Sequence, residues 1–358
     1  MPVQLQAAGP ASGNWHKIQT KFAAKAQVCC AIFQMKRSVS RFSFKGTAFV
    51  SKNAIHNHKY VFEAIPYFVK IADGKSFYMS NTLFIGKVYY RFDELPSTND
   101  WAAEFIASRQ KEAAKTRPPE GMVVRAANQT AGKGQLGSLW QSQPGENLLI
   151  SIVLYPTWLT VSDQFYLSMA VALALRDVVV RAIKAEDLHG LAERDKRSSE
   201  FQLTTSRIKI KWPNDLYIGD QKTAGILIQN TIAGSGLQSS IVGVGLNINQ
   251  LNFPPELPNA TSLARSVGVV YDIDDIADRF FECLEKRYLQ LKSGEKKAVK
   301  AEYEAHLWRR GITTTFIRQA TGATFEGTIQ GVNERGELLI QTDTETATFE
   351  VKEVSVVV

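Results

Sequence analysis

The stretch QTAGKGQLGSLW, residues 129–140, contains three glycines in the pattern G-x-G-x-x-G. In dinucleotide-binding proteins this pattern follows a strand, opens a helix and precedes an acidic residue by about twenty positions. Residues 121–129 predict the strand. A helix is excluded by Pro144 and Gly145, which are followed by the β-rich run 148–155, and no acidic residue stands at the required distance. The sequence therefore predicts a glycine loop that joins two strands.

A second compact motif is KWPNDL, residues 211–216. Pro213 ends strand hydrogen bonding, so Asn214 and Asp215 are expected on a turn at the end of a strand. A lysine, an amide and a carboxylate are thereby presented together at a sheet edge, where α/β enzymes often bind ligands. Because Asn and Asp are also ordinary turn residues, the motif alone leaves a purely structural turn open.

The composition is that of a globular protein, with 44% apolar and 22% charged residues in a chain of 358. The sequence contains no run of eighteen apolar residues, so it predicts no transmembrane helix, and no membrane partner is expected. The three cysteines show neither metal-ligand spacing nor a disulfide framework, which is typical of a reducing compartment. None of the five histidines lies in a motif, which argues against a zinc site and against a histidine-based catalytic triad.

The net charge of +7 is unevenly distributed. Residues 1–78 hold 11 Lys and Arg against 2 acidic residues, whereas the rest of the chain holds 31 against 33. The basic character therefore does not indicate nucleic-acid binding by the folded body. A basic, serine-containing and acid-poor segment is typical of an organelle transit peptide. We favour a disordered tail, or upstream sequence before a natural start at Met79, over this alternative, and therefore expect a cytoplasmic location with targeting left open.

The remaining chain divides by its patterning. The apolar and aromatic run 83–95 predicts a strand, and Ser97 and Thr98 can cap the helix that follows it. A long apolar helix is expected over 162–183. Beyond Gly311, short apolar segments separated by turn signals predict a small β-barrel. Three domains are expected: a basic extension over 1–78, a catalytic domain over 79–310 and the small β-domain over 311–358.

Five motifs occur in a fixed order, namely ELPSTND (94–100), the glycine loop, KWPNDL, KTAGILIQ (222–229) and GVGLNIN (243–249). In this combination the chain resembles the biotin protein ligases, also called biotin–[carboxylase] ligases or holocarboxylase synthetases. The resemblance runs from about Leu83 to the C-terminus. It implies an α+β fold, in which a biotin/lipoate ligase-like domain with a mixed sheet and helices is followed by an SH3-like β-barrel.

The resemblance also implies an activity. Such ligases condense biotin with ATP to give biotinyl-5′-AMP and pyrophosphate, and then transfer biotin to one lysine of a carboxyl carrier protein or domain. The first step brings a carboxylate against a triphosphate, so like charges must be neutralised. Mg²⁺ is expected with ATP and would be held mainly by phosphate oxygens and waters, because no protein cage for a metal is visible in the sequence.

The resemblance assigns roles residue by residue. Lys133 and Lys211 would neutralise the biotin carboxylate and the adenylate phosphate, and Asp215 would orient or deprotonate the acceptor amine. The loop glycines let the backbone approach the ligand and offer N–H groups to anionic oxygens. The positions that match the biotin or adenylate site are Ser97, Thr98, Asn99, Gln129, Gly132, Lys133, Gly134, Gln135, Trp140, Lys211, Asn214, Gly225 and Asn247. For Ser97 and Thr98 a plain helix cap, and for Trp140 a core aromatic, remain open.

Gln135 is where the chain departs from the pattern, because many family members carry arginine at this position. Arginine is permanently charged and offers five donors, whereas glutamine offers two donors and no charge. If the side chain faces the adenylate, Gln135 should hold it less tightly. If the contact is made by the backbone N–H, the substitution should matter little.

Two other readings lie close to this one. The lipoate–protein ligases belong to the same superfamily, but KWPNDL and the terminal β-domain favour biotin. Some biotin ligases are also transcriptional repressors with an N-terminal helix-turn-helix; residues 1–78 show no such pair of amphipathic helices, so a monofunctional enzyme without a nucleic-acid partner is expected. The sequence leaves open whether the enzyme forms a homodimer and which carboxylase subunit accepts biotin.

Overall fold

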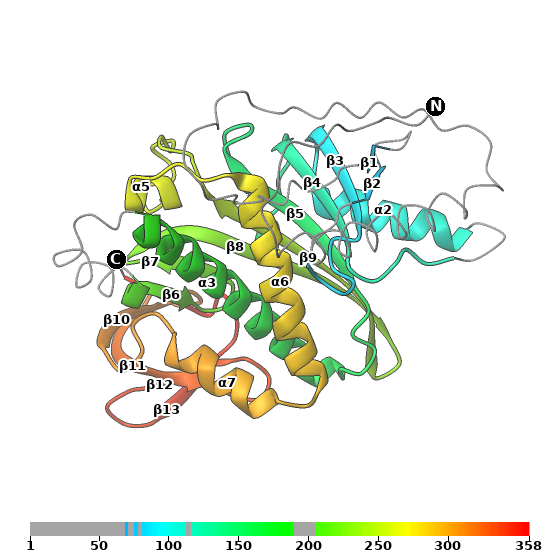
Figure 1. Ribbon diagram of the computed structural model, residues 1–358. Helices are drawn as coiled ribbons and strands as arrows, with labels where there is room; N and C mark the ends of the chain where they lie inside the picture. Colours follow the sequence, from blue (N-terminus) through cyan, green and yellow to red (C-terminus); the bar gives the residue numbers. More distant parts are fainter. Residues whose placement is uncertain (1–68, 71–74, 78–80, 112–115, 190–204, 358) are drawn as a thin grey trace, which may run out of the picture. The chain divides into compact units, whose positions relative to one another are not determined.

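The computed structural model describes residues 69–70, 75–77, 81–111, 116–189 and 205–357. Every described residue belongs to one compact unit, Ala64–Val358. The basic extension predicted over 1–78 therefore lies outside the described residues, apart from two short strands. Two β-sheets and the helices around them make up the described fold, which is mixed α+β as predicted (Figure 1).

The larger sheet has nine strands in the order β1-β2-β3-β4-β5-β9-β8-β7-β6. Only β3 and β4 run parallel, and all other neighbours are antiparallel. The predicted strands on both sides of the glycine loop are confirmed as β4 and β5. The bounds are β1 (Val69–Lys70), β2 (Lys75–Phe77), β3 (Val88–Leu95), β4 (Met122–Gln129), β5 (Asn147–Leu154), β6 (Ile208–Lys211), β7 (Asp215–Ile218), β8 (Gln221–Ala233) and β9 (Gly236–Asn247).

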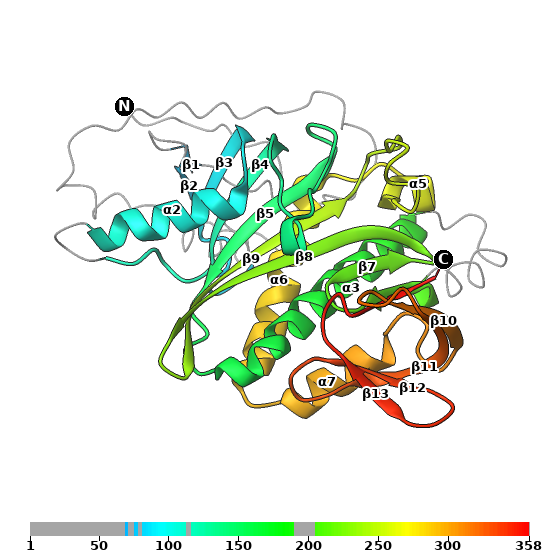
Figure 2. The ribbon, with the colours of Figure 1, turned by 180° about the vertical axis from the view of Figure 1, so that it is seen from behind.

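Helices cover both faces of this sheet. On one face α2 (Thr98–Lys111) buries Ala102 and Ile106 against β4 and β5. The other face is covered by α3 (Gln164–His189) and α6 (Ile273–Lys292), which pack on each other (Figures 1 and 2). Every residue of β5 is buried because the strand lies between these two layers. The remaining helices are η2 (Gln135–Gly137), η3 (Val161–Asp163), α5 (Leu263–Val267) and α7 (Lys296–Ala305).

The predicted strand over 83–95 begins only at Val88. The backbone N–H groups of Leu83, Phe84 and Ile85 instead donate to the Glu285 carboxylate, at 2.6, 2.8 and 3.1 Å. This carboxylate belongs to α6, about 200 residues further along the chain, and its side chain is buried. The apolar pattern of the segment is real, but a distant acceptor satisfies its backbone and ends the ladder.

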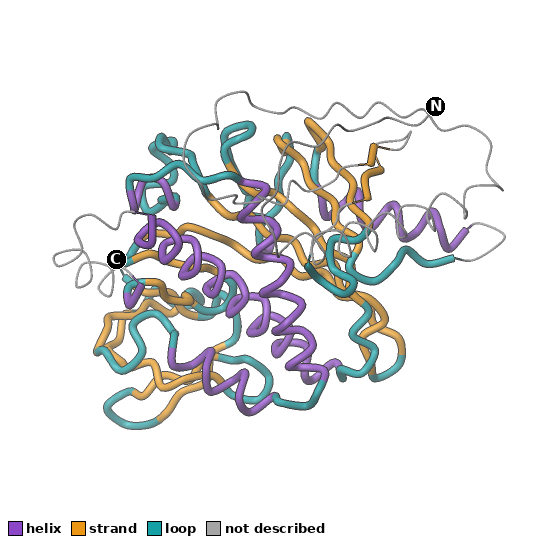
Figure 3. The backbone as a smooth tube through the Cα atoms, in the orientation of Figure 1, coloured by secondary structure: helices purple, strands orange, loops and turns teal. Residues whose placement is uncertain are grey.

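The second sheet has the order β13-β12-β11-β10-β14 and is antiparallel throughout. Phe316, Phe325 and Phe349 stack in its core. β13 and β14 are its two edges, so the sheet is open and the predicted closure into a barrel is absent from its pairing. Its strands are β10 (Thr313–Arg318), β11 (Thr324–Val332), β12 (Leu338–Gln341), β13 (Thr346–Phe349) and β14 (Val354–Val356). In Figure 3 the strands of this sheet lie beside α7.

One turn of the terminal sheet packs closely against the larger body. The indole N–H of Trp212 donates to the Gly336 carbonyl at 2.8 Å. A Cβ atom on Gly336 would collide with the Phe165 ring, so the turn packs directly on α3. Glu334 accepts from the Tyr166 hydroxyl at 2.5 Å and pairs with Lys300 at 3.0 Å. The KWPNDL motif and the terminal sheet are thus held side by side.

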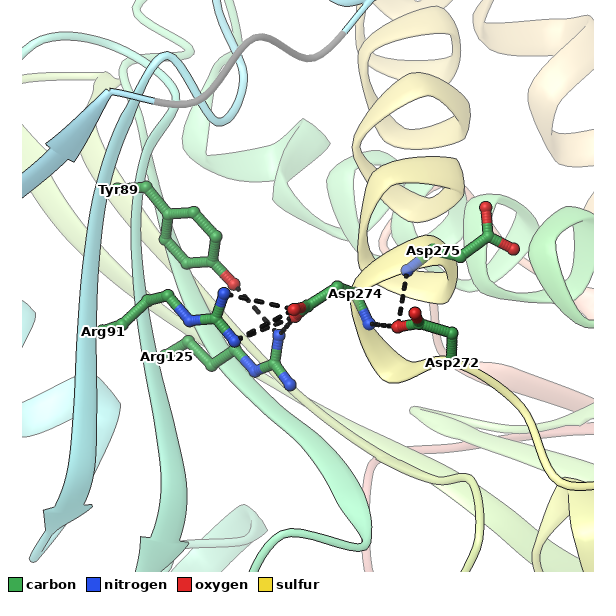
Figure 4. A network of polar contacts seen from close by, with 6 residues as sticks. All are labelled: Tyr89, Arg91, Arg125, Asp272, Asp274 and Asp275. Carbon is green, nitrogen blue, oxygen red and sulfur yellow. Dashed lines mark hydrogen bonds and ion pairs between the residues drawn. The ribbon is translucent and has the colours of Figure 1, made fainter. Parts of the chain in front are cut away.

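A charged network joins the sheet to α6 (Figure 4). Asp274 on α6 accepts from Arg91 on β3 at 3.0 Å and from Arg125 on β4, which also lies 3.4 Å from the Tyr89 hydroxyl. Burial alone would raise the pKa of Asp274, but the charges of Arg125 and Arg91 outweigh it and lower that pKa. The helix is capped separately by Asp272, which accepts from the backbone N–H groups that follow it.

Candidate functional site

A cavity of about 230 Å³ opens between the glycine loop, the start of α2 and strands β8 and β9. Eleven of the fourteen site residues predicted from the sequence line it. They are Ser97, Thr98, Asn99, Gln129, Lys133, Gly134, Gln135, Trp140, Asn214, Asp215 and Gly225. We call this space the first cavity. These eleven residues come from segments that are far apart in the chain, and the sheet order brings those segments together here.

A connected chain of polar side chains forms one end of the first cavity. The Gln129 amide oxygen accepts from the backbone N–H of Thr98 at 2.7 Å and from its hydroxyl at 3.1 Å. Ser151 donates toward the Thr98 hydroxyl at 2.7 Å and the Asn99 amide oxygen at 2.5 Å, and Asn99 donates to Gln229 at 3.1 Å. Donors and acceptors are therefore held in fixed positions. Ser151 could not be predicted from the sequence because it lies within a strand without a motif, whereas Gln229 is the last residue of KTAGILIQ but was assigned no role.

Glycines form the floor of the first cavity. Gly225 and Gly245 face each other across β8 and β9, and the Trp140 indole lies on them. A Cβ atom on Gly225 would stand 2.9 Å from that indole, and one on Gly245 would collide with it. On Gly243 a Cβ atom would collide with the Asn99 amide. The Trp140 indole N–H is buried and has no hydrogen-bond partner among the described residues, so Trp140 is a cavity wall as well as a packed aromatic.

The ammonium group inside the first cavity belongs to Lys222. It pairs with Asp215 at 2.7 Å and lies 5.6 Å from the centre of the Trp140 ring. Lys222 is the first residue of KTAGILIQ and was not among the predicted site residues. Its place three residues before Gly225 on the same strand was the available signal. Lys133, at the rim, pairs with Asp100 of α2 at 2.8 Å. With Lys352, on the turn before β14, three lysines from different parts of the chain line the first cavity.

Lys211 does not line the first cavity, and its predicted role toward the adenylate phosphate stays a prediction. Lys211, Asp215, Gly225 and Gly245 are neighbours in one row across β6 to β9, and Lys211 is the outermost of them. Its amine donates to the Tyr217 hydroxyl at 3.0 Å and lies over the Trp308 ring. Burial lowers the pKa of Lys211, and Lys222 contributes in the same direction, against Asp215. The position in the row directs this lysine toward the terminal sheet.

Gly132 and Asn247 also do not line the first cavity. Gly132 closes the glycine loop, because its carbonyl accepts a hydrogen bond from the backbone N–H of Trp140 at 2.9 Å. Asn247 donates to the Thr261 carbonyl at 3.0 Å, and its amide oxygen is buried without a partner among the described residues. Asn214 is on the predicted turn, but Asp215 is already the first residue of β7. The predicted contacts of Gly132 and Asn247 with ligand are therefore not supported by this geometry.

No group of three or more His, Cys, Asp or Glu side chains within the described ranges is arranged to bind a metal ion. Asp215 is the acidic residue that lines the first cavity. One carboxylate together with substrate phosphates is the usual environment of Mg²⁺ in nucleotide sites, so these residues fit Mg²⁺ carried in with ATP. None of the helices in the described part of the chain is long and apolar enough to cross a membrane.

Comparison with known proteins gives a consistent result. Residues 94–247 match the model of the Biotin/lipoate A/B protein ligase family. The bifunctional ligase/repressor BirA of Bacillus subtilis is 32% identical over 247 residues, which are 67% of this chain and 68% of that protein. The biotin–[acetyl-CoA-carboxylase] ligase of Mycobacterium tuberculosis is 26% identical over 256 residues, covering 71% of this chain and 85% of that protein.

The fold agrees with these sequence relatives. The biotin protein ligase from Aquifex aeolicus in complex with biotin and ATP superposes with a TM-score of 0.56 at 23% identity, covering 75% of this chain and 97% of that one. The chain belongs to the Biotin/lipoate A/B protein ligase family. Within that family it groups with the biotin protein ligases.

Proposed function

We propose that this chain activates biotin with ATP as biotinyl-5′-AMP and transfers the biotinyl group to one lysine of a carboxyl carrier protein or domain. The observation that carries the proposal is the first cavity. There a fixed polar network, a glycine floor and three lysines meet around a space of about 230 Å³. Relatives named as biotin–[acetyl-CoA-carboxylase] ligases give the substrate class.

The polar network suits the biotin ring. A cyclic urea both donates and accepts hydrogen bonds, and Thr98, Asn99 and Gln129 line the cavity with both kinds of group. Ser151, buried outside the lining, holds Thr98 and Asn99 in place by hydrogen bonds. The rest of biotin is apolar, and Ile150 and the Trp140 indole supply apolar surface in the same cavity. Each end of biotin therefore has a complementary part of the first cavity.

For the first step we assign charge neutralisation to Lys222 and Lys133. A biotin carboxylate oxygen attacks the α-phosphorus of ATP, the new P–O bond replaces the bond to the leaving pyrophosphate, and negative charge accumulates on both sides. Fixed cations in a partly dehydrated cavity stabilise such charge strongly. Lys222 is two-thirds buried and held by Asp215, so it is pre-positioned. The N–H groups of the glycine loop add donors at close range.

For the second step we assign Asp215 to the acceptor amine. At pH 7 a free lysine with a pKa near 10.4 needs about 4.6 kcal/mol to lose its proton. The neutral nitrogen attacks the acyl carbon, a C–N bond forms, and the C–O bond to AMP breaks with the electron pair leaving on phosphate. Asp215 would orient the amine and accept a released proton. No nucleophile of the enzyme is needed, because the adenylate is the activated acyl donor.

The domain division is part of the same proposal. We assign residues 79–310 to catalysis and 311–358 to an SH3-like terminal domain. The end of α7 at Ala305 and the start of β10 at Thr313 support a boundary near Gly311. The antiparallel sheet with its aromatic core supports an SH3-like relationship, although its two edge strands are unpaired with each other.

The proposed activity predicts biotin-dependent exchange of pyrophosphate into ATP, followed by labelling of a carboxyl carrier domain. The purified chain would be incubated with ATP, Mg²⁺, biotin and the carrier domain, and the product read on a streptavidin blot. Lipoate would replace biotin in a parallel reaction, with the carrier mass measured instead. Exchange and mass gain with lipoate but not biotin would assign the chain to the lipoate ligases.

Replacing Gln135 with arginine should slow the release of trapped biotinyl-AMP by about fivefold. A hydrogen bond to a charged group contributes about 1 kcal/mol more than one between neutral groups, and Gln135 lines the cavity that would hold the phosphate. Release would be followed by rapid filtration of enzyme loaded with labelled adenylate. Gln135→Leu separates the two contact modes, since it keeps the backbone N–H. Equal release from all three proteins would assign the contact to that N–H.

A further inference from the structure

An ion pair at the rim of the first cavity joins the glycine loop to α2. The Lys133 ammonium lies 2.8 Å from the Asp100 carboxylate. Lys133 lines the first cavity, and Asp100 directly follows the lining residues Thr98 and Asn99 on the helix. One partner of this ion pair therefore faces the space assigned to the adenylate, and the other is fixed to α2.

The loop that carries Lys133 is a small hairpin held by its own backbone. The Trp140 N–H donates to the Gly132 carbonyl at 2.9 Å, and the Gly134 N–H donates to the Ser138 carbonyl at 2.7 Å. Lys133 stands between these two bonds. A change of partner by the Lys133 side chain therefore breaks neither of them, and the loop keeps its shape.

Lys133 and Lys222 each have a carboxylate partner, but the two ion pairs differ in exposure. The side chains of Lys222 and Asp215 are 34% and 18% exposed, whereas those of Lys133 and Asp100 are 48% and 37% exposed. Water screens the charges of an exposed pair, so such a pair is held weakly. An incoming anion therefore separates the pair of Lys133 more easily than the pair of Lys222.

Asp100 can release Lys133 without becoming an isolated charge. It lies in the first turn of α2, where the positive end of the helix dipole stabilises a carboxylate. Its backbone N–H donates to the Ser97 hydroxyl at 3.3 Å, so the helix end stays fixed during the change. Both partners thus have an alternative, which is the helix end for Asp100 and a ligand phosphate for Lys133.

We propose that Asp100 is the resting counter-ion of Lys133 and competes for it with the phosphate of biotinyl-AMP. This inference rests on the proposed ligase function. While the adenylate is bound, Lys133 pairs with its phosphate. When Asp100 takes Lys133 back, the phosphate loses one cation and the ligand leaves more readily. Asp100 is a positioning residue, because it acts through Lys133, and it limits how long the adenylate stays on the enzyme.

Removing the charge of Asp100 tests the inference on the full chain. Asp100→Asn keeps the size of the side chain, and Glu104→Gln makes the same change at an exposed position one turn further along α2 that does not line the first cavity. The release of labelled biotinyl-AMP and of labelled biotinamide, which has the biotin ring but no charge, is measured by displacement with unlabelled ligand.

We expect Asp100→Asn to release biotinyl-AMP about three- to fivefold more slowly, which is the scale of one exposed ion pair, and to release biotinamide within about twofold of the unmodified chain. Glu104→Gln should change neither rate. In a Lys133→Gln background, Asp100→Asn should change the release of biotinyl-AMP by less than about 1.5-fold, because the competition needs Lys133. Asp100→Ser decides the result if the melting curve shows that Asp100→Asn does not fold.

Unchanged or faster release of biotinyl-AMP in Asp100→Asn would overturn the inference, and faster release would mean that Asp100 holds the loop over the ligand. Equal slowing of both ligands, or an undiminished effect in the Lys133→Gln background, would overturn it as well, because the phosphate or Lys133 would then not be involved. Absence of biotin-dependent ATP–pyrophosphate exchange in the unmodified chain would instead refute the ligase function, so the two failures are distinguishable.

Discussion

Lys222→Ala is expected to lower the rate of biotin-dependent ATP–pyrophosphate exchange by about 10²–10³-fold, the effect of removing one preorganised charge-stabilising donor. Lys222 is the ammonium group held inside the first cavity, at 2.7 Å from Asp215. The negative charge that it would offset is largest when pyrophosphate leaves, so the loss should fall on the rate constant more than on the affinity for biotin. Exchange kinetics at varied biotin concentration separate the two.

Two substitutions serve as controls for this result. Lys222→Arg keeps the charge but changes its geometry, so we expect partial recovery. Lys286→Ala removes an exposed lysine of α6 that does not line the first cavity, and should leave the rate of exchange unchanged. Lys211→Ala is the decisive comparison, because the KWPNDL motif alone assigns the first-step charge to Lys211. Normal exchange in Lys222→Ala, together with a large loss in Lys211→Ala, would return the role to the motif lysine.

Asp274→Asn should lower the free energy of unfolding by about 2–3 kcal/mol at pH 7. Breaking a buried ion pair costs about 3–5 kcal/mol, because the remaining charge stays buried without compensation. Here the side chain of Asp274 is 37% exposed, so we take a lower value. Arg125 is the charge that remains, with only 11% of its side chain exposed. Urea unfolding of the two proteins, followed by tryptophan fluorescence, measures the difference.

The pH dependence gives this prediction a second readout. The pKa of Asp274 is lowered in the folded protein, so its contribution is complete above its unfolded pKa, near 3.9, and is lost as the pH falls through the lower folded value. The difference in the free energy of unfolding between wild type and Asp274→Asn should therefore be constant between about pH 5 and pH 7, where Asp274 stays ionised. It should shrink in more acid solution. Asp275→Asn, next in the helix and paired with Arg279 at the surface, should change stability by less than about 0.5 kcal/mol. Equal losses in both variants would contradict the network.

Local features of the sequence predicted much of the fold correctly. Strands β4 and β5 and the glycine loop between them follow from β-rich runs and from Pro144 and Gly145, which act on their immediate neighbours. The start of α2 was readable too, because Ser97 caps it by accepting from the Asp100 N–H at 3.3 Å. The ordered set of motifs was sufficient to identify the family, because each motif is a short stretch that can be recognised from its residue types alone.

What the sequence alone did not determine depends on contacts between distant segments. The strand predicted over 83–95 begins only at Val88. The backbone N–H groups before it donate instead to the carboxylate of Glu285 on α6. Lys211 and Lys222 look equivalent in sequence, but the row across β6 to β9 directs the first toward the terminal sheet and leaves the second in the cavity. Lys352 of the terminal sheet lines the first cavity only because that sheet packs on α3. Residue types and local propensity thus set the family and most elements, whereas sheet register and domain docking decided which side chains meet, because those contacts join groups that no local pattern connects.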